Sequence, residues 1–190
     1  MRSDNRYTLD DKDIIKKILE ENEPGYFDVL YKRYFPKVMD KCYSLVKDRN
    51  LAEELAGDIM CNTYEKLTSF KGMSSFSSWL YSITYNHCID YLRKKNKLHY
   101  PSWNRNNEIP EIIDDPDERI ESVNPENLML VLDLIHPEEK ALLLMKYQDN
   151  LSIKQISAAL RISEDAVKMR LKRARTRVLY LYSIKFMKDA

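Results

Sequence analysis

The sequence contains little glycine and cysteine and no long apolar run. It holds three glycines among 190 residues, too few and too scattered for the glycine-rich loops that bind phosphates in nucleotide-binding folds. The sequence has no stretch of about 18 apolar residues, which is the length needed to span a membrane, and its first residues lack the apolar core of a secretion signal. These absences exclude a phosphate-cradling enzyme and favour a cytosolic location.

The cysteines also indicate no cofactor. Cys42, Cys61 and Cys88 are odd in number, widely spaced and free of any CxxC pattern, and the three histidines are equally dispersed. Neither a disulfide framework nor a zinc site is therefore expected. The three thiols are interpreted as buried or half-buried groups of a protein in a reducing cytosol.

Helical periodicity dominates the first half of the chain, and strand-like alternation is almost absent. Apolar residues spaced by three and four predict helices over residues 27–38, roughly 50–68 and about 75–96, with a polar loop around residues 71–74. Pro36 lies inside the first of these stretches, so we expect a kink or a break near residues 34–35. The sequence predicts an all-α fold of two small helical domains.

An acidic segment separates the two halves. Residues 106–126 hold eight acidic side chains against one basic, and four of the seven prolines lie in or beside this stretch. Proline interrupts helices and like charges repel, so residues 98–125 are predicted to form an extended linker.

Helix-capping signals punctuate the second half. Pro137 suits the first position of a helix, Ser152 with Gln155 forms a capping box, and Ser163 is a second N-cap. The helices that these signals open, over 153–160 and from 164 onward, are joined by about three residues. This spacing predicts a helix-turn-helix.

A basic block lies on the second of these helices. Residues 168–177 hold six basic side chains and no acid, as a helix that contacts DNA phosphates and guanine edges requires. Neutralising about six phosphates would give log affinity against log salt a slope near −5. Helical spacing places an apolar stripe on one side, formed by Val167, Leu171, Ala174 and Val178. The side chains expected to face outward are Lys168, Met169, Lys172, Arg173 and Thr176.

A second basic block, residues 93–97, ends the long central helix. Trp79, Tyr81 and Tyr85 precede it, with Asn86, and basic groups beside aromatic rings can hold unstacked single-stranded bases. Cations also stabilise a helix C-terminus, and Trp79 could equally be a core residue. Both interpretations stay open on composition alone. No catalytic or metal-binding signature occurs, so the chain is interpreted as a binding protein with no small-molecule substrate.

The order of these motifs resembles the bacterial RNA polymerase sigma factors of the extracytoplasmic-function (ECF) group of the sigma-70 family. In the first half the resemblance rests on Phe27, Leu30, Tyr31, Tyr34 and Val38, on residues 52–58 and 70–72, and on Phe76, residues 79–83, Asn86 and residues 90–93. In the second half it rests on residues 151–157, 162–163, 167–168, 170–171 and 173–175.

The resemblance implies a role for each block. It divides the chain into an N-terminal extension (1–22), a region 2 domain (23–97), the linker (98–125) and a region 4 domain (126–187). The implied partners are core RNA polymerase, through its β′ clamp and β flap, promoter DNA and an anti-sigma factor. The linker would thread toward the polymerase active centre and mimic RNA phosphates with its acids. Residues implied to dock on the β′ clamp are Glu53, Glu54, Leu55 and Asp58. Those implied to bind the minus-ten element are Lys71, Gly72, Met73, Ser74, Asn86, Arg93 and Lys94. Those implied to read the minus-35 element are Lys168, Met169, Arg170, Lys172 and Arg173.

Two positions depart from the family pattern. Arg161 stands at the turn of the helix-turn-helix, where a small residue or glycine is common, and Gly57 stands where glutamine is common. Two other functions fit the residues: a stand-alone helix-turn-helix regulator with an N-terminal sensor or dimerisation domain, and a protein-interaction adaptor whose basic faces only solubilise it. Binding to duplex DNA without polymerase would favour the regulator, and salt-insensitive partner binding without DNA contacts would favour the adaptor.

Overall fold

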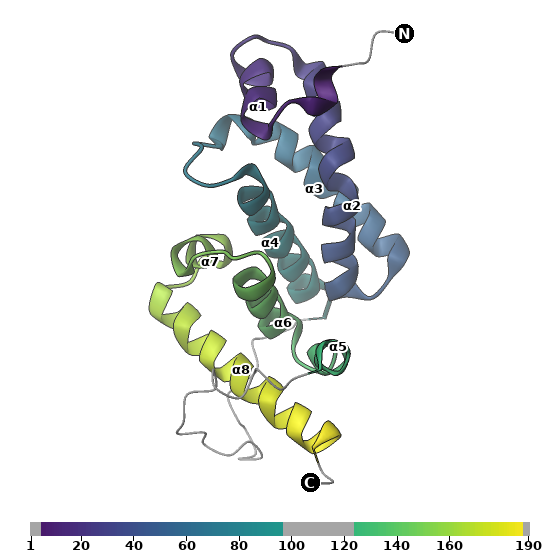
Figure 1. The fold of residues 1–190 in the computed structure, drawn as a ribbon, viewed down its shortest axis with the longest axis vertical. Coiled ribbons are helices and arrows are strands. Elements are labelled where there is room, and N and C mark those ends of the chain that lie inside the picture. The colour runs from purple at the N-terminus through teal and green to yellow at the C-terminus, as the bar shows by residue number, and fades with distance from the viewer. Residues whose placement is uncertain (1–4, 97–123, 188–190) are drawn as a thin grey trace. The chain divides into compact units, whose positions relative to one another are not determined.

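The computed structural model describes residues 5–96 and 124–187 (Figure 1). Every regular element in these residues is helical, which confirms the predicted all-α fold. The chain forms two compact units, residues 1–94 and 95–190. The predicted linker, residues 98–125, lies almost entirely outside the described residues.

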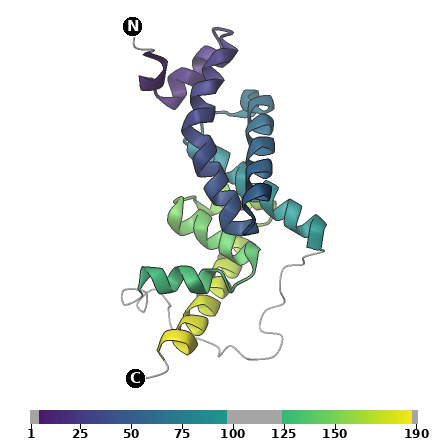
Figure 2. The same cartoon turned by 90° about the vertical axis from the view of Figure 1, so that its right-hand side faces the viewer.

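The first unit is built around a hairpin of two long helices that run side by side (Figures 1 and 2). Its helices are α1 (Asp11–Leu19), α2 (Phe27–Val46), α3 (Arg49–Glu65) and α4 (Phe76–Asn96), with short 3-10 turns η1 (Asn5–Thr8), η2 (Pro24–Tyr26) and η3 (Leu67–Ser69). Lys47 ends α2 in the left-handed conformation, with φ 56°. Asp48 then caps α3 by accepting a hydrogen bond from the Leu51 N–H at 3.1 Å. The sharp reversal therefore comes from two adjacent residues.

Pro36 does not interrupt α2, which continues through it as one helix. Of the predicted kink or break at this position, the break does not occur. Proline removes the N–H that would bond the carbonyl of Lys32, but Pro36 is exposed on the helix surface, where water can bond that carbonyl instead.

The N-terminal helix α1 is fastened to α2 by one carboxylate. Asp11 Oδ1 lies 2.5 Å from Arg33 Nη1, and its other oxygen accepts a hydrogen bond from the Tyr34 hydroxyl. Arg33 also donates to the Leu9 carbonyl at 2.8 Å. Burial and the bond to Asp11 raise the pKa of Tyr34 well above its usual value, so this hydroxyl stays a donor. Residues that the sequence assigned to an extension thus pack onto the first unit.

The second unit confirms the predicted capping signals. Its helices are α5 (Pro125–Leu132), α6 (Pro137–Leu143), a π-helical turn η5 (Leu144–Gln148) that continues α6, α7 (Ile153–Leu160) and α8 (Glu164–Phe186). Pro137 takes the first position of α6, Ser152 and Gln155 form both bonds of the capping box, and Ser163 caps α8. The Tyr182 hydroxyl accepts a hydrogen bond from the Asn124 N–H at 3.0 Å, which joins the start of α5 to α8.

Candidate nucleic-acid interface

Local hydrogen bonds close the turn between α7 and α8 around a left-handed residue. Arg161 has φ 54° and ψ 44°, and its N–H donates to the Ser157 carbonyl. The Ile162 N–H reaches the same carbonyl at 3.2 Å, and Ser157 Oγ donates to the Ile162 carbonyl at 2.5 Å. These bonds offset the mild strain of a left-handed residue other than glycine. The predicted helix-turn-helix forms with Arg161 in its turn.

The apolar side of α8 is buried as predicted. Its four members are Val167, Leu171, Ala174 and Val178, none more than 7% exposed. Lys168, Met169 and Lys172 are exposed, and Arg173 is half-buried. Thr176 is only 5% exposed, so the prediction that it faces outward is wrong. Helix α8 packs against α5, α6 and α7, which cover a wider arc of its surface than a single stripe.

Two arginines of the basic block bind buried carboxylates of α6. Arg170 Nη1 lies 3.5 Å from Glu138, and Arg177 Nη1 lies 3.5 Å from Glu139, whose side chains are nearly inaccessible. Burial raises the pKa of Glu139, and the Arg177 guanidinium partly opposes that rise. The two ion pairs hold α8 against α6, and one of them engages Arg170, which the family resemblance implies to read the minus-35 element.

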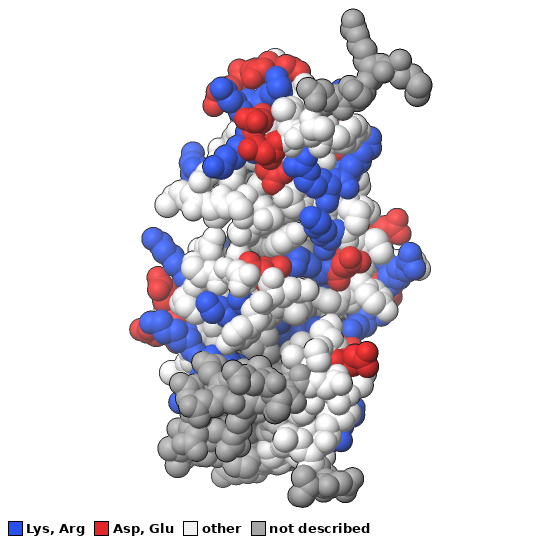
Figure 3. Space-filling model, viewed as in Figure 1, with Lys and Arg blue, Asp and Glu red and all other residues white. Residues whose placement is uncertain are grey.

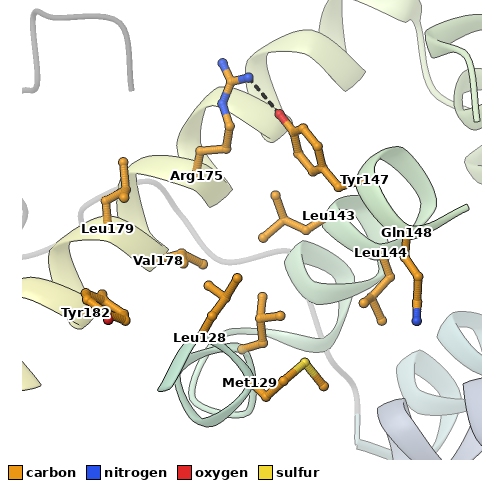
Figure 4. Close-up of a pocket in the computed structure, with 11 residues that line it drawn as sticks. Leu128, Met129, Leu143, Leu144, Tyr147, Gln148, Arg175, Val178, Leu179 and Tyr182 are labelled. Carbon is orange, nitrogen blue, oxygen red and sulfur yellow. Dashed lines mark hydrogen bonds between the residues drawn. The ribbon is translucent and has the colours of Figure 1, made fainter. Parts of the chain in front are cut away.

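An apolar cavity of about 380 Å³ opens among α5, η5 and α8 (Figure 4). At one side of it, Arg175 Nη1 donates a hydrogen bond to the Tyr147 hydroxyl at 2.8 Å. Arg175 therefore joins Arg170 and Arg177 in bonding to groups of its own unit. Apolar side chains that line the cavity include Leu128, Met129, Leu132, Leu143, Leu144, Val178 and Leu179.

Sequence reasoning missed this cavity because its walls come from helices far apart in the chain. The sequence did carry one signal for it: α5 and the residues after it hold more apolar side chains than one buried helix stripe can accommodate. Three of these are more than half exposed, namely Met129, Leu130 and Leu134. Exposed apolar groups beside a cavity indicate a binding surface for a partner.

The start of α8 carries charges of both signs. In Figure 3 basic and acidic side chains alternate along the left-hand edge, where Figure 1 shows the start of α8. Lys168 Nζ lies 3.2 Å from Asp165, and both side chains are well exposed. Such an exposed pair contributes less than about 1 kcal/mol, so Lys168 can exchange Asp165 for a phosphate.

In the first unit, the loop before α4 has a firm base and an exposed tip. The rings of Phe70, Phe76 and Trp79 pack together with centroids 5.2 to 5.8 Å apart, so Trp79 belongs to an intramolecular cluster. Between them Gly72 takes a left-handed φ of 66°, and Met73 is 88% exposed. Lys71 is also exposed, whereas Ser74 is half-buried.

Two of the α4 rings that were candidates for base stacking, Tyr81 and Tyr85, have contacts within the first unit. Tyr85 is fully buried, so the interpretation of this ring as a base-stacking platform is wrong. Tyr81 is half-buried, and Lys41 Nζ lies 4.2 Å from its ring centroid. Asn86, which follows Tyr85 in the sequence, is half-buried. Farther along, Arg93 lies 3.6 Å from Asp90, and Lys94 is exposed.

The predicted β′-docking residues lie on two sides of α3. Glu53, Glu54 and Asp58 are exposed, but Leu55 is only 3% exposed and packs into the core. Leu55 therefore supports α3 from beneath. The other three predicted residues leave an acidic group on the exposed side of α3.

Sequence comparisons agree with this arrangement. Residues 30–98 match the Sigma-70 region 2 family, and residues 126–178 match the Sigma-70 region 4 family. The ECF RNA polymerase sigma factor SigW of Bacillus subtilis is 27% identical over 174 residues, covering 85% of this chain and 90% of that protein. SigX of the same organism is 24% identical over 147 residues, covering 75% and 76%. The chain belongs to the ECF group of the sigma-70 family.

Solved structures show the same fold. CnrH in complex with the cytosolic domain of CnrY matches with a TM-score of 0.59 at 16% identity, over 90% of this chain and 97% of that chain. The Bartonella quintana sigma factor RpoE, in complex with the anti-sigma factor NepR, matches with a TM-score of 0.57 at 19% identity, over 84% and 98%.

This sigma factor thus acts in transcription initiation, and its family is not one of enzymes. The helix-turn-helix lies within region 4, and the exposed loop before α4 lies within region 2. Among the described residues no cluster of His, Cys, Asp and Glu could hold a metal ion. None of the described helices is long and apolar enough to cross a membrane.

Proposed function

We propose that this sigma factor binds core RNA polymerase, reads the minus-35 duplex with α8 and captures melted minus-ten bases with region 2. The observation that carries the proposal is the orientation of α8. Its apolar stripe is buried, and Lys168, Lys172 and Arg173 lie off that stripe on the second helix of a helix-turn-helix. Cationic side chains on such a helix reach phosphates and guanine edges in the major groove.

Within the minus-35 surface the residues divide by role. Lys168, Lys172 and Arg173 supply the charge, and the exposed Met169 can contact a thymine methyl group. The side chain of Arg170 is 24% exposed and paired with Glu138, so it fixes the orientation of α8 and only its exposed part can reach DNA.

The minus-ten surface combines the loop of residues 71–75 with α4. Lys71, Met73 and Lys94 are exposed, and Asn86 offers an amide that can bond a base edge. Extruding a base costs a few kcal/mol, which contacts from a fixed loop can offset. The aromatic cluster beneath the loop supplies that fixed base, and Gly72 supplies the left-handed turn. Ser74 and Arg93 complete the proposed surface.

The acidic face of α3 is the proposed contact with the β′ clamp. Glu53, Glu54 and Asp58 project from one helix into solvent, which suits a basic partner surface. Leu55 holds that helix in the core.

An anti-sigma factor is the proposed regulatory partner. CnrH and RpoE, which share this fold, were each solved with such a protein or a cytosolic domain bound. The apolar cavity of region 4 suits insertion of apolar side chains from an anti-sigma factor or from the β flap.

Promoter-directed transcription with purified core polymerase tests the proposal. Lys168→Glu and Arg173→Glu should each reduce transcription from a promoter that depends on its minus-35 element, while binding to core polymerase stays unchanged. Lys185→Glu is the matched control, because Lys185 is exposed near the far end of the same helix.

Two outcomes would contradict the proposal. If both variants lost core binding to the same extent as promoter use, α8 would be a polymerase-binding helix. If the isolated protein bound one duplex tightly and did not bind core polymerase, it would act as a stand-alone regulator.

A further inference from the structure

Two buried thiols lie in contact in the core of the first unit. Cys42 on α2 and Cys88 on α4 are separated by 46 positions in the sequence, yet their sulfur atoms are 3.5 Å apart. Both side chains are completely inaccessible to solvent, and both are reduced. The third thiol, Cys61, is exposed on α3.

A disulfide needs only a short further approach. Its sulfur atoms are bonded at about 2.05 Å, so the gap has to close by roughly 1.5 Å. Rotations of two side chains and a small shift of α2 toward α4 can supply a movement of this size. No third ligand accompanies the pair among the described residues, which makes cross-linking a better use of the two thiols than metal binding.

We propose that Cys42 and Cys88 are a redox-active pair that a hydroperoxide converts into a reversible disulfide between α2 and α4. Cys88 donates the S–H hydrogen bond to Cys42, so a thiolate at Cys42 has a donor to stabilise it. Cys42 releases its proton, its thiolate attacks a peroxide oxygen, the O–O bond breaks, and the leaving hydroxide takes up that proton, so a sulfenic acid and water form. The Cys88 sulfur then attacks the Cys42 sulfur and displaces a second water. In sum, two thiols and one hydrogen peroxide give one disulfide and two waters.

The environment makes this reaction slow. The hydrogen bond to Cys42 and burial both raise the pKa of Cys88 well above its usual value, so this thiol rarely ionises. Peroxide can reach the pair only when α2 and α4 separate transiently. The exposed Cys61 should therefore react first, and the pair should respond to prolonged oxidant.

The disulfide would lie beside the basic and aromatic groups of region 2. Lys41 precedes Cys42, and its Nζ lies 3.4 Å from the Tyr85 hydroxyl, one helical turn before Cys88. The link would therefore clamp α2 to α4 directly beneath this cluster.

The test uses the full chain with Cys61 replaced by Ser, so that no intermolecular cross-link can form. The protein is incubated with hydrogen peroxide, quenched in acid, alkylated in denaturant and digested for mass spectrometry. We expect a Cys42–Cys88 peptide pair lighter by two hydrogen atoms, and its complete reversal by dithiothreitol. A 46-residue loop closed in the unfolded state should raise the thermal midpoint of the first unit by at least ~10 °C.

Wild-type protein, treated in parallel, shows that the oxidant acts, because its exposed Cys61 is oxidised. The proposal is overturned if Cys42 and Cys88 stay fully alkylatable in that sample when the oxidant treatment is prolonged well beyond the time at which Cys61 has been consumed. It is also overturned if the two cysteines cross-link only after the protein is unfolded in urea. Both of these outcomes are measured on wild-type protein, so the test still holds if the Cys61→Ser variant does not fold.

Discussion

The different contacts of the basic residues along α8 predict how strongly the affinity for promoter DNA depends on salt concentration. Of the six basic residues between 168 and 177, Arg170, Arg175 and Arg177 bond to groups of their own unit. The other three lie off the buried stripe: Lys168 and Lys172 are exposed, Arg173 is half-buried, and the partner of Lys168, Asp165, is itself exposed. Each phosphate neutralised contributes about −0.9 to the slope of log affinity against log salt. The block should therefore contribute about −3, in place of the −5 that six cations would give.

The measurement compares holoenzymes on one labelled promoter over a series of salt concentrations. Fluorescence anisotropy gives the affinity at each salt, and the slope of the wild type is compared with that of each variant. Other DNA contacts of the holoenzyme cancel in this difference. Lys168→Ala, Lys172→Ala and Arg173→Ala should each make the slope shallower by about 0.9, and the triple variant by about 3.

Arg175→Gln is the decisive comparison. It removes a charge from the same block, but that charge is bonded to the Tyr147 hydroxyl of its own unit. The slope should stay within error of the wild type, as it should for Lys185→Ala. If Arg175→Gln made the slope shallower by as much as Lys172→Ala does, the charges of this helix would act regardless of the direction in which they point, and the structural assignment would fail.

Three further predictions concern stability. Gly57→Ala should raise the unfolding free energy of the first unit by about 1 kcal/mol, because an added Cβ meets nothing within 4 Å inside α3; an unchanged melting midpoint would contradict this. Ser152→Ala should destabilise the second unit by about 1 kcal/mol by removing the capping box of α7, as urea titration can measure, with exposed Ser183→Ala as control. The folded state raises the pKa of Glu139 above 4.5, so it holds that proton more tightly than the unfolded chain does. The stabilisation by protonated Glu139 is complete below pH ~4.5 and is lost as the pH rises through the pKa of the folded state. The unfolding free energy of Glu139→Gln should therefore rise relative to that of the wild type over this pH range. If the unfolding free energies of the two proteins changed with pH in parallel, the raised pKa would be refuted.

Local features of the second unit could be predicted from the sequence. The capping box at Ser152 and Gln155, the cap at Ser163 and the first-turn Pro137 all occur where the residue types indicate. These features depend on hydrogen bonds between residues two to four positions apart, so the necessary partners lie within one short window. The buried stripe of α8 was predictable for a similar reason, since helical spacing alone places its members on one side.

Pro36 and Tyr85 show where local rules stopped being sufficient. Proline argued for a break, but α2 continues because that turn faces water. Aromatic residues near cations argued for base stacking, but Tyr85 is enclosed and Tyr81 lies under Lys41. In both cases the outcome depends on a neighbour, either solvent or a side chain from another helix. A short stretch of sequence does not show such a neighbour.

The sequence by itself determined an all-α chain, a helix-turn-helix and a cationic second helix, because each follows from periodicity, caps and composition. Only the tertiary structure decided which cations are available. Arg170 and Arg177 are held by carboxylates more than 30 positions away on α6, whereas Lys168 and Lys172 are exposed. The contact between Cys42 and Cys88 was decided in the same way. Whether a charge or a thiol meets a partner depends on how helices pack, and packing joins residues that the sequence keeps far apart.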